Sequence, residues 1–179
     1  MTRQLEPTTA APSCHRLVHL ASERDIPAIE ALHQRCSTEA LNGRYLGFPP
    51  PRAIETLLRK TETYVVPGDD GLLAVGNLAL RHDGGARWAE VAVLVRDDHQ
   101  RHGHGTDLIR AMAGAAKGRG ARELATITRP GHALAARVMS RSLGPVSIRI
   151  EDGLATVTCS LYRTHSLVAV ASDEACAFG

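Results

Sequence analysis

Apolar residues in the first third of the chain change from strand spacing to helical spacing and back. Ile26, Ile29 and Leu32 recur at helical intervals behind Asp25, a residue type that caps helix N-termini. A segment rich in glycine and proline then breaks the periodicity, which predicts a loop. The expected elements are a strand over residues 15–20, a helix over 25–36, a loop over 41–51 and a helix over 52–61.

The middle and the end of the chain read as strands and helices joined by short turns. The turns over residues 67–71 and 82–85 separate three apolar strands, which predicts an antiparallel meander. A helical segment follows the third strand, so we expect the next strand to pair with it in parallel. The expected elements are strands over residues 64–66, 72–81, 86–96 and 122–128, helices ending at Lys117 and covering 132–142, and a terminal hairpin over 146–151 and 154–161.

Two glycines lie between the third strand of the meander and its helix. Val91–Val95 is an apolar, β-branched run, and Gly103 and Gly105 precede the helical spacing. Glycine adopts backbone angles that other residues avoid and leaves no side chain in the way. Successive main-chain amides at the helix start can converge on an anion, which the helix dipole also favours. The residues alone therefore predict a phosphate-binding turn.

Length and composition favour one soluble, cytoplasmic domain. The chain has 179 residues, 44% of them hydrophobic, which is enough for one core; we expect a domain over residues 15–163 between tails over 1–14 and 164–179. The net charge of +2 gives no general reason to expect a membrane surface or nucleic acid, and arginine is spread along the chain. The four cysteines lie far apart in sequence, which predicts neither a zinc site nor a disulfide framework and fits a reducing compartment. No apolar run approaches the ~18 residues of a membrane span.

The glycine turn carries a recognisable signature. Residues 100–105, Gln-Arg-His-Gly-His-Gly, match the Gln/Arg-x-x-Gly-x-Gly/Ala signature of the GNAT superfamily of acyl-CoA N-acyltransferases. Residues 89–95 and 37–48 resemble the branch that includes the acetyltransferase domains of bacterial protein-lysine acetyltransferases. The resemblance covers residues 15–161. It implies a mixed α/β fold, with a central, mostly antiparallel sheet and helices on both faces.

Dinucleotide-binding folds also place a glycine turn at a strand end. Such a site needs a third glycine and an acidic residue at the end of the next strand. Leu108 stands at the place of the third glycine, and Thr128 and Arg129 end the next strand. These residues disfavour a dinucleotide site.

The resemblance implies acetyl-CoA as the acyl donor, without a metal ion. The pyrophosphate would lie on loop amides, with a charge-assisted contact from the Arg101 side chain. The pantetheine arm would lie beside the glycine-loop strand, on the amides of Val93 and Val95, whose side chains we expect in the core. A main-chain amide would then stabilise the oxyanion. The residues expected to bind acetyl-CoA are Val93, Val95, Gln100, Arg101, His102, Gly103, His104, Gly105 and Thr106.

Glu90 is the predicted general base for the amine nucleophile. It is flanked by apolar residues in a strand, where burial would make it a better proton acceptor near neutral pH. Similar domains carry a glutamate at this place, often acting through water. The alternative is a surface-facing Glu90 that pairs with an arginine or lysine across the sheet. The nearby histidines are expected to be mostly solvated turn residues: His82, His99, His102 and His104.

The predicted last helix departs from the family pattern. Many GNAT enzymes carry an Asn at its start, a Tyr that protonates the leaving thiolate, and a Gly-Phe ending. Counted back from Gly144, these places hold Ala133, Ser140 and Pro145. Ser140 retains a hydroxyl that can donate a hydrogen bond, but on a short side chain; otherwise water or the thiol itself serves the acid step.

The predicted function is acetyl transfer from acetyl-CoA to a primary amine, on a protein lysine or a small molecule. The alternative is a noncatalytic acyl-CoA-binding sensor or interaction module of the same fold, which the missing Asn and Tyr favour. Nucleic-acid binding is disfavoured because the charge is balanced. The segment over residues 41–51 and the terminal hairpin are expected to shape the acceptor cleft, and the hairpin is also a candidate homodimer contact.

Overall fold

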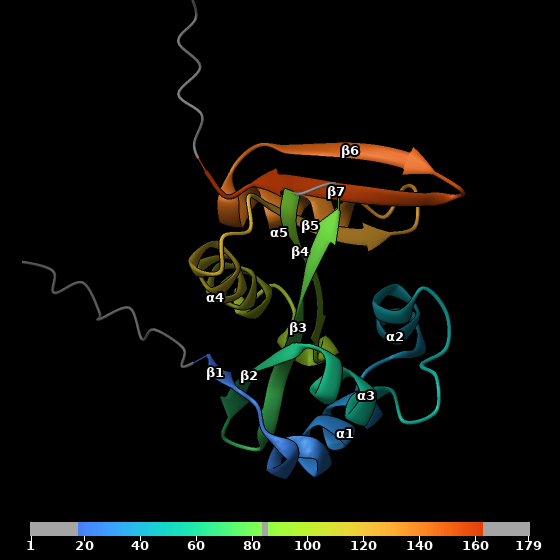
Figure 1. Ribbon diagram of the computed structural model, residues 1–179. Helices are drawn as coiled ribbons and strands as arrows, with labels where there is room; N and C mark the ends of the chain where they lie inside the picture. The colour runs from blue at the N-terminus through green and yellow to red at the C-terminus, as the bar shows by residue number, and fades with distance from the viewer. Residues whose placement is uncertain (1–17, 84–85, 163–179) are drawn as a thin grey trace, which may run out of the picture.

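One seven-stranded sheet spans the molecule, with the strand order β1-β2-β3-β4-β5-β7-β6 (Figure 1). The structure is a computed structural model that describes residues 18–83 and 86–162. Neighbouring strands are antiparallel except β4 and β5, which run parallel. The strands are β1 (His19–Leu20), β2 (Glu62–Gly68), β3 (Gly71–Asp83), β4 (Ala86–Val95), β5 (Glu123–Thr128), β6 (Val146–Glu151) and β7 (Leu154–Ser160).

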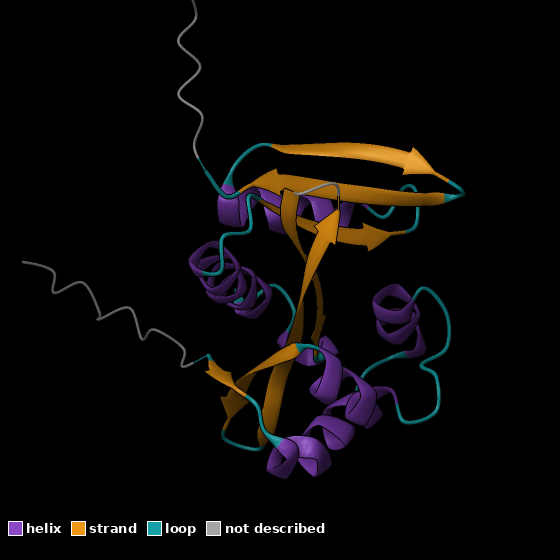
Figure 2. Cartoon of the chain, in the orientation of Figure 1, coloured by secondary structure: helices purple, strands orange, loops and turns teal. Residues whose placement is uncertain are grey.

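Helices cover both faces of this sheet, as Figure 2 shows in purple. On one face lie α4 (His104–Gly118) and α5 (Ala133–Leu143), which share a core with β3, β4, β5 and β7. On the other lie α1 (Ile26–Gln34), α2 (Thr38–Tyr45) and α3 (Ala53–Lys60). Short 3-10 turns at Glu23–Asp25 and Asp97–His99 complete the described secondary structure. This arrangement confirms the predicted fold class.

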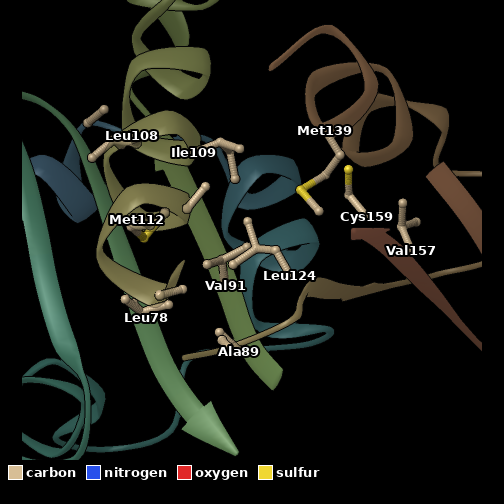
Figure 3. Packing of buried hydrophobic residues seen from close by; sticks show 14 of the residues in the cluster. Leu78, Ala89, Val91, Leu108, Ile109, Met112, Leu124, Met139, Val157 and Cys159 are labelled. Carbon is tan, nitrogen blue, oxygen red and sulfur yellow. The ribbon is translucent and has the colours of Figure 1, made fainter. Parts of the chain in front are cut away.

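The larger core lies between the sheet and α4 with α5 (Figure 3). Leu108 and Met112 of α4 belong to the same core cluster as Val91 of β4, and both are fully buried. Gly76 of β3 lets Met112 approach, because an added Cβ at this glycine would lie 2.9 Å from Met112 Cε. Met139 of α5 extends the same core toward β7.

The second core lies on the opposite face, beneath α1. Ile29 and Leu32 of α1 pack there with Val75 and Leu94. Leu94 therefore faces α1, whereas Val91 faces α4, as alternation along a strand requires. By the same alternation Glu90 faces the side of the sheet that carries α1, α2 and α3.

One predicted loop is wrong in part, because α2 occupies residues 38–45. The Ser37 hydroxyl caps this helix by accepting a hydrogen bond from the Ala40 amide. The helix ends at Leu46, which has the left-handed φ of 58°. Gly43 lies inside α2, so here a glycine marks neither a turn nor a helix end.

The remaining element predictions hold with small changes of boundary. The meander, the parallel crossover through α4, the helix α5 and the terminal hairpin lie where the sequence places them. The first strand is short within the described residues, and its predicted start over residues 15–17 lies outside them. The two predicted tails, 1–14 and 164–179, also fall outside the described part of the chain.

Candidate functional site

The parallel strands β4 and β5 separate part of the way along the sheet. Their pairing ends where Glu90 meets Ala125, after which β4 continues to Val95 and β5 to Thr128. On its other edge β4 stays paired with β3 as far as Val95. The sheet is therefore open on one side of β4 beyond Glu90.

The main-chain amides of Val93 and Val95 face this opening. The next amide along, that of Arg96, donates to the Leu73 carbonyl on the β3 side at 2.9 Å. Because main-chain groups of successive strand residues point to opposite edges, the amides of Val95 and Val93 point away from β3. The side chains of both valines pack against the core under α4, as the sequence predicts.

The glycine loop that follows brings the start of α4 beside the opening. Gly103 has a left-handed φ of 92°, and Arg101 reaches a positive φ of 64°. The first helical hydrogen bond to the loop runs from the Asp107 amide to the Gly103 carbonyl, so the amides of residues 104–106 precede the helical hydrogen-bond ladder. An added Cβ at Gly105 would lie 3.7 Å from Val95 Cγ2 and 3.8 Å from Val138 Cγ1, which places this turn between β4 and α5.

Three histidine rings gather at the same loop. The ring centroids of His99 and His102 are 6.0 Å apart, and His104 lies 6.0 Å from His99 and 6.4 Å from His102. The exposed His102 donates from Nδ1 to the Gln100 carbonyl at 2.8 Å, which shapes the loop. His104 is only 3% exposed, so the expectation of a solvated turn residue is wrong for this histidine.

Arg96 fixes the segment between β4 and the glycine loop. Its side chain is 5% exposed and contacts Asp70 Oδ1 at 2.9 Å through Nη1 and Asp98 Oδ1 at 2.7 Å through Nε. Asp70 lies in the β2–β3 turn and also pairs with Arg35 at 3.0 Å. Hydrogen bonds from Arg96 lower the pKa of both aspartates. The sequence gives no signal for this network, because its members come from separate turns.

Glu90 lies at the point where β4 and β5 separate. Its carboxylate accepts hydrogen bonds from Arg81 of β3, at 2.9 Å from Nη2 and 3.2 Å from Nε. The Glu90 side chain is 29% exposed, so it is half-buried rather than enclosed. The cross-strand ion pair that the sequence left as an alternative is present.

The helix α2 covers the same face of the opening as Glu90 (Figure 1). Arg44 donates from Nη2 to the Asn77 side-chain oxygen on β3. At the end of α2 the Leu46 carbonyl accepts a hydrogen bond of 2.8 Å from Arg129, which follows β5. The segment thus connects β3 with the far side of the opening, and it lies opposite α4. That residues 41–51 shape an acceptor cleft stays a prediction; the first part of this segment, up to Tyr45, is helical.

The predicted acid Ser140 lies on an exposed position of α5. Its neighbour Met139 occupies the buried position instead. Ala133 begins the helix and Pro145 follows its last turn, as the sequence count places them. The structure shows no contact of the Ser140 hydroxyl with Glu90 or with the glycine loop among the described residues.

The described residues contain neither a metal-ligand cluster nor a membrane-spanning helix. Within 18–83 and 86–162, no set of three or more His, Cys, Asp or Glu side chains is arranged to hold a metal ion. None of the helices in this part of the chain has the length and apolar character needed to cross a membrane.

Comparison with known proteins gives a family match. The sequence matches the acetyltransferase (GNAT) family over residues 15–144. No protein of curated function matches the chain by sequence. Both the match and the fold confirm the resemblance carried by the glycine turn.

Solved structures share this fold at low sequence identity. The GNAT domain of S. lividans PAT superposes with a TM-score of 0.70 at 19% identity, covering 80% of this chain and 89% of that one. The yncA protein of Salmonella typhimurium, solved with its cofactor acetyl-CoA, has a TM-score of 0.64 at 14% identity, with coverage of 86% and 98%. The ribosomal-protein-S18-alanine N-acetyltransferase of Escherichia coli has a TM-score of 0.61 at 17% identity, with coverage of 85% and 97%.

Proposed function

Since this chain belongs to the acetyltransferase (GNAT) family, we propose that it transfers the acetyl group of acetyl-CoA to a primary amine, on a protein lysine or a small molecule. The observation that carries the proposal is the open side of β4 between Glu90 and the glycine turn. There, outward-facing amides, a helix N-terminus and a carboxylate lie along one strand and the loop that follows it. Neighbours of the same fold include a protein solved with acetyl-CoA, which supports the choice of donor.

Acetyl-CoA fits the chemistry of the groups around the opening. The amides of residues 104–106 and the positive end of the α4 dipole suit a pyrophosphate, with Arg101 adding a charge-assisted contact. Gln100 and His102 set the shape of the loop through main-chain contacts. The amides of Val93 and Val95 suit the pantetheine arm, whose amide groups pair with main chain as a strand does.

The reaction follows from this placement of the donor. The neutral amine attacks the thioester carbonyl, a carbon–nitrogen bond forms, and a β4 amide stabilises the oxyanion. Glu90 accepts the amine proton, directly or through water. The carbon–sulfur bond then breaks and the CoA thiolate takes a proton. Ser140 is the proposed proton donor of this last step, with water as the alternative.

Two glutamate-to-glutamine variants, one at Glu90 and one at a control position, test the role of Glu90. In Glu90→Gln the carboxylate is lost while the shape is kept, so we expect kcat to fall roughly 100-fold or more, with the KM for acetyl-CoA unchanged. The matched control is Glu123→Gln, an exposed glutamate on β5. Wild-type turnover by Glu90→Gln with a good amine acceptor would show that the base lies elsewhere.

Ser140→Ala tests the acid step separately. If Ser140 protonates the thiolate, this change lowers kcat with amines and leaves acetyl-CoA affinity intact. Ser142→Ala is the control, because the Ser142 hydroxyl donates to the Val138 carbonyl within α5 at 2.6 Å. Equal kcat for wild type and Ser140→Ala would assign the step to water or to the thiol.

The cellular setting is proposed from the cysteines. Cys36 and Cys159 are free thiols in the described part of the chain. Burial raises the pKa of Cys36 to about 11, so this thiol is unreactive at neutral pH. Free thiols support a reducing, cytoplasmic location.

A further inference from the structure

Arg44 is a half-buried cation on the acceptor side of the sheet. Its guanidinium donates to Asn77 and lies 4.9 Å above the ring centroid of Tyr45. In the part of the chain that the structure describes, no carboxylate lies within ion-pair distance of Arg44. Among the described side chains, one hydrogen bond engages its five N–H donors, the one to Asn77.

Asn77 can hold Arg44 in only one way. The Asn77 amide nitrogen donates to Thr63 Oγ1 at 2.9 Å and to Thr61 Oγ1 at 3.2 Å. Both N–H groups of the Asn77 amide are therefore engaged, by Thr63 in β2 and by Thr61 just before it. Only the Asn77 side-chain oxygen is left to accept from the Arg44 guanidinium. Asn77 is only 6% exposed, so this orientation is set inside the fold.

The helix that carries Arg44 is held in the same manner. Tyr45 is bonded to His33 of α1, with 2.8 Å between the hydroxyl oxygen and Nε2, and His33 Nδ1 donates to the Ile29 carbonyl at 2.7 Å. Because a carbonyl only accepts, Nδ1 carries the proton and Nε2 of the neutral ring accepts from Tyr45. Burial lowers the pKa of His33, which favours this neutral form. The Arg44 guanidinium is therefore held in place by Asn77 on β3 and, through its neighbour Tyr45, by His33 on α1.

Arg44 is also close to the proposed chemistry. Asn77 lies opposite Ala92 in the β3–β4 pairing, and Ala92 and Glu90 face the same side of β4. Burial lowers the pKa of Arg44, and the charges of Tyr45 and then Glu90 oppose this shift only in part. A ligand held by Arg44 would thus lie beside the carboxylate that we propose as the base.

Two further arginines lie near Arg44 on this face. Arg81 is already paired with Glu90, and Arg129 holds the end of the α2 segment across the opening. An amine acceptor that brought only its own positive charge would be repelled by the Arg44 guanidinium. An acceptor that also carries a carboxylate would offset this repulsion, and a planar carboxylate fits the fork of a guanidinium.

We propose that the acceptor is a small amine that carries a carboxylate, and that Arg44 holds this carboxylate while the amine faces Glu90. This inference rests on the proposed function and names the substrate class of the same site. A lysine within a protein carries its amine on a neutral main chain and supplies no carboxylate of its own. Arg44 is then a specificity-determining residue, whose loss affects acceptor recognition and leaves acetyl-CoA recognition intact.

The test uses an amine panel built in matched sets. Each set contains an amino acid, its carboxamide and the amine without the carboxyl group, with different spacings between amine and carboxyl; a lysine-containing peptide with a blocked C-terminus completes the panel. For wild-type protein with acetyl-CoA, we expect at least one amino acid to exceed its carboxamide by about tenfold or more in kcat/KM. In Arg44→Gln the same amino acid falls to the level of its carboxamide, mainly through KM.

Controls separate loss of recognition from loss of fold. Arg44→Lys keeps the charge and loses the fork, so it should retain part of the preference. Arg59→Gln changes an exposed arginine on α3 and should leave the preference intact. Thermal unfolding and the KM for acetyl-CoA show whether each variant is folded and binds its donor.

The outcomes distinguish this inference from the proposed function. Equal kcat/KM for amino acids and carboxamides, a best acceptor among the peptides, or a preference that survives Arg44→Gln would overturn the role of Arg44 while acetyl transfer stands. An absence of acetyl transfer to every amine of the panel would overturn the proposed function, and this inference with it.

Discussion

Asp97 accepts two hydrogen bonds from Ser37, one from its main-chain amide and one from its hydroxyl, each at 2.7 Å. The two residues are 60 positions apart in sequence. Ser37 caps α2, and Asp97 begins the turn that leads into the glycine loop. This contact ties the acceptor-side helix to the proposed donor-binding loop. The proposed donor and acceptor sites are therefore joined through this one contact.

Asp97→Ala should weaken the use of both substrates. Without the carboxylate, α2 loses its tether and Gln100 loses a contact of 3.4 Å from Nε2. We expect the KM for acetyl-CoA and for the acceptor to rise roughly three- to tenfold each. Initial rates with each substrate varied in turn measure this, and Asp69→Ala, in the exposed β2–β3 turn, is the control. A rise in only one KM would show that the two sites are independent.

Gly103→Ala should weaken acetyl-CoA binding and lower stability. A side chain at φ 92° is strained, which costs about 1–2 kcal/mol of unfolding free energy and displaces the helix-start amides. Gly114→Ala, on an exposed turn of α4 with open space around it, should instead gain up to about 1 kcal/mol. Denaturant unfolding and calorimetric titration with acetyl-CoA measure both changes. Unchanged acetyl-CoA affinity in Gly103→Ala would move the pyrophosphate site away from this turn.

Met112→Ala should cost about 2–5 kcal/mol of unfolding free energy. Its side chain is fully buried against Leu108 and fills the space left by Gly76. Leu134→Ala, on the exposed side of α5, should change stability far less, because 45% of this leucine is already exposed. Urea unfolding of the two variants compares them directly. Similar losses for both would contradict the burial assigned to α4.

Stability should fall as the pH drops below the ordinary pKa of histidine, and His33 is one cause. Burial lowers the pKa of His33 from 6.5 in the folded state. At a pH between the lowered pKa of His33 in the folded state and its ordinary pKa in the unfolded state, the unfolded chain binds a proton at His33 that the folded chain does not. Lowering the pH through this range therefore favours unfolding. Above 6.5 both states are neutral and the contribution is fully present.

A histidine variant isolates this contribution. In His33→Gln the unfolding free energy should decrease less than in wild type as the pH falls from about 8 to about 5. The control replaces His82, an exposed histidine at the end of β3, and His82→Gln should show the same decrease as wild type. Denaturant unfolding at several pH values provides the measurement. Identical pH slopes for His33→Gln and wild type would show that His33 titrates alike in both states.

The sequence predicts the parts of the fold that have local signals. Alternating residues, glycine turns and apolar helix faces locate the meander, the parallel crossover and the glycine loop. The side-chain directions of Val91 and Leu94 then follow from strand alternation alone. The glycine loop carries both a local conformation and a family signature, so the proposed donor site is the best predicted region.

The acceptor side is predicted less well, because long-range contacts create it. The helix α2 has no buried residue, and its cap binds Asp97 of a distant turn. Arg44 is positioned by Asn77, and Glu90 by Arg81, partners that become visible only once the β3–β4 register is known. The exposure of Ser140 and the burial of His104 likewise depend on tertiary packing.

The most direct measurement follows the acetyl group itself. Purified wild-type protein is incubated with acetyl-CoA carrying an isotopically labelled acetyl group and with the amine panel, and products are identified by mass spectrometry. This readout avoids thiol reagents, which would react with the four cysteines of the chain as well as with released CoA. The account predicts labelled N-acetyl product in equal amount to released CoA, dependent on amine and strongly reduced in Glu90→Gln. Tight acetyl-CoA binding with no labelled product from any amine would contradict it and would leave a binding module of the same fold.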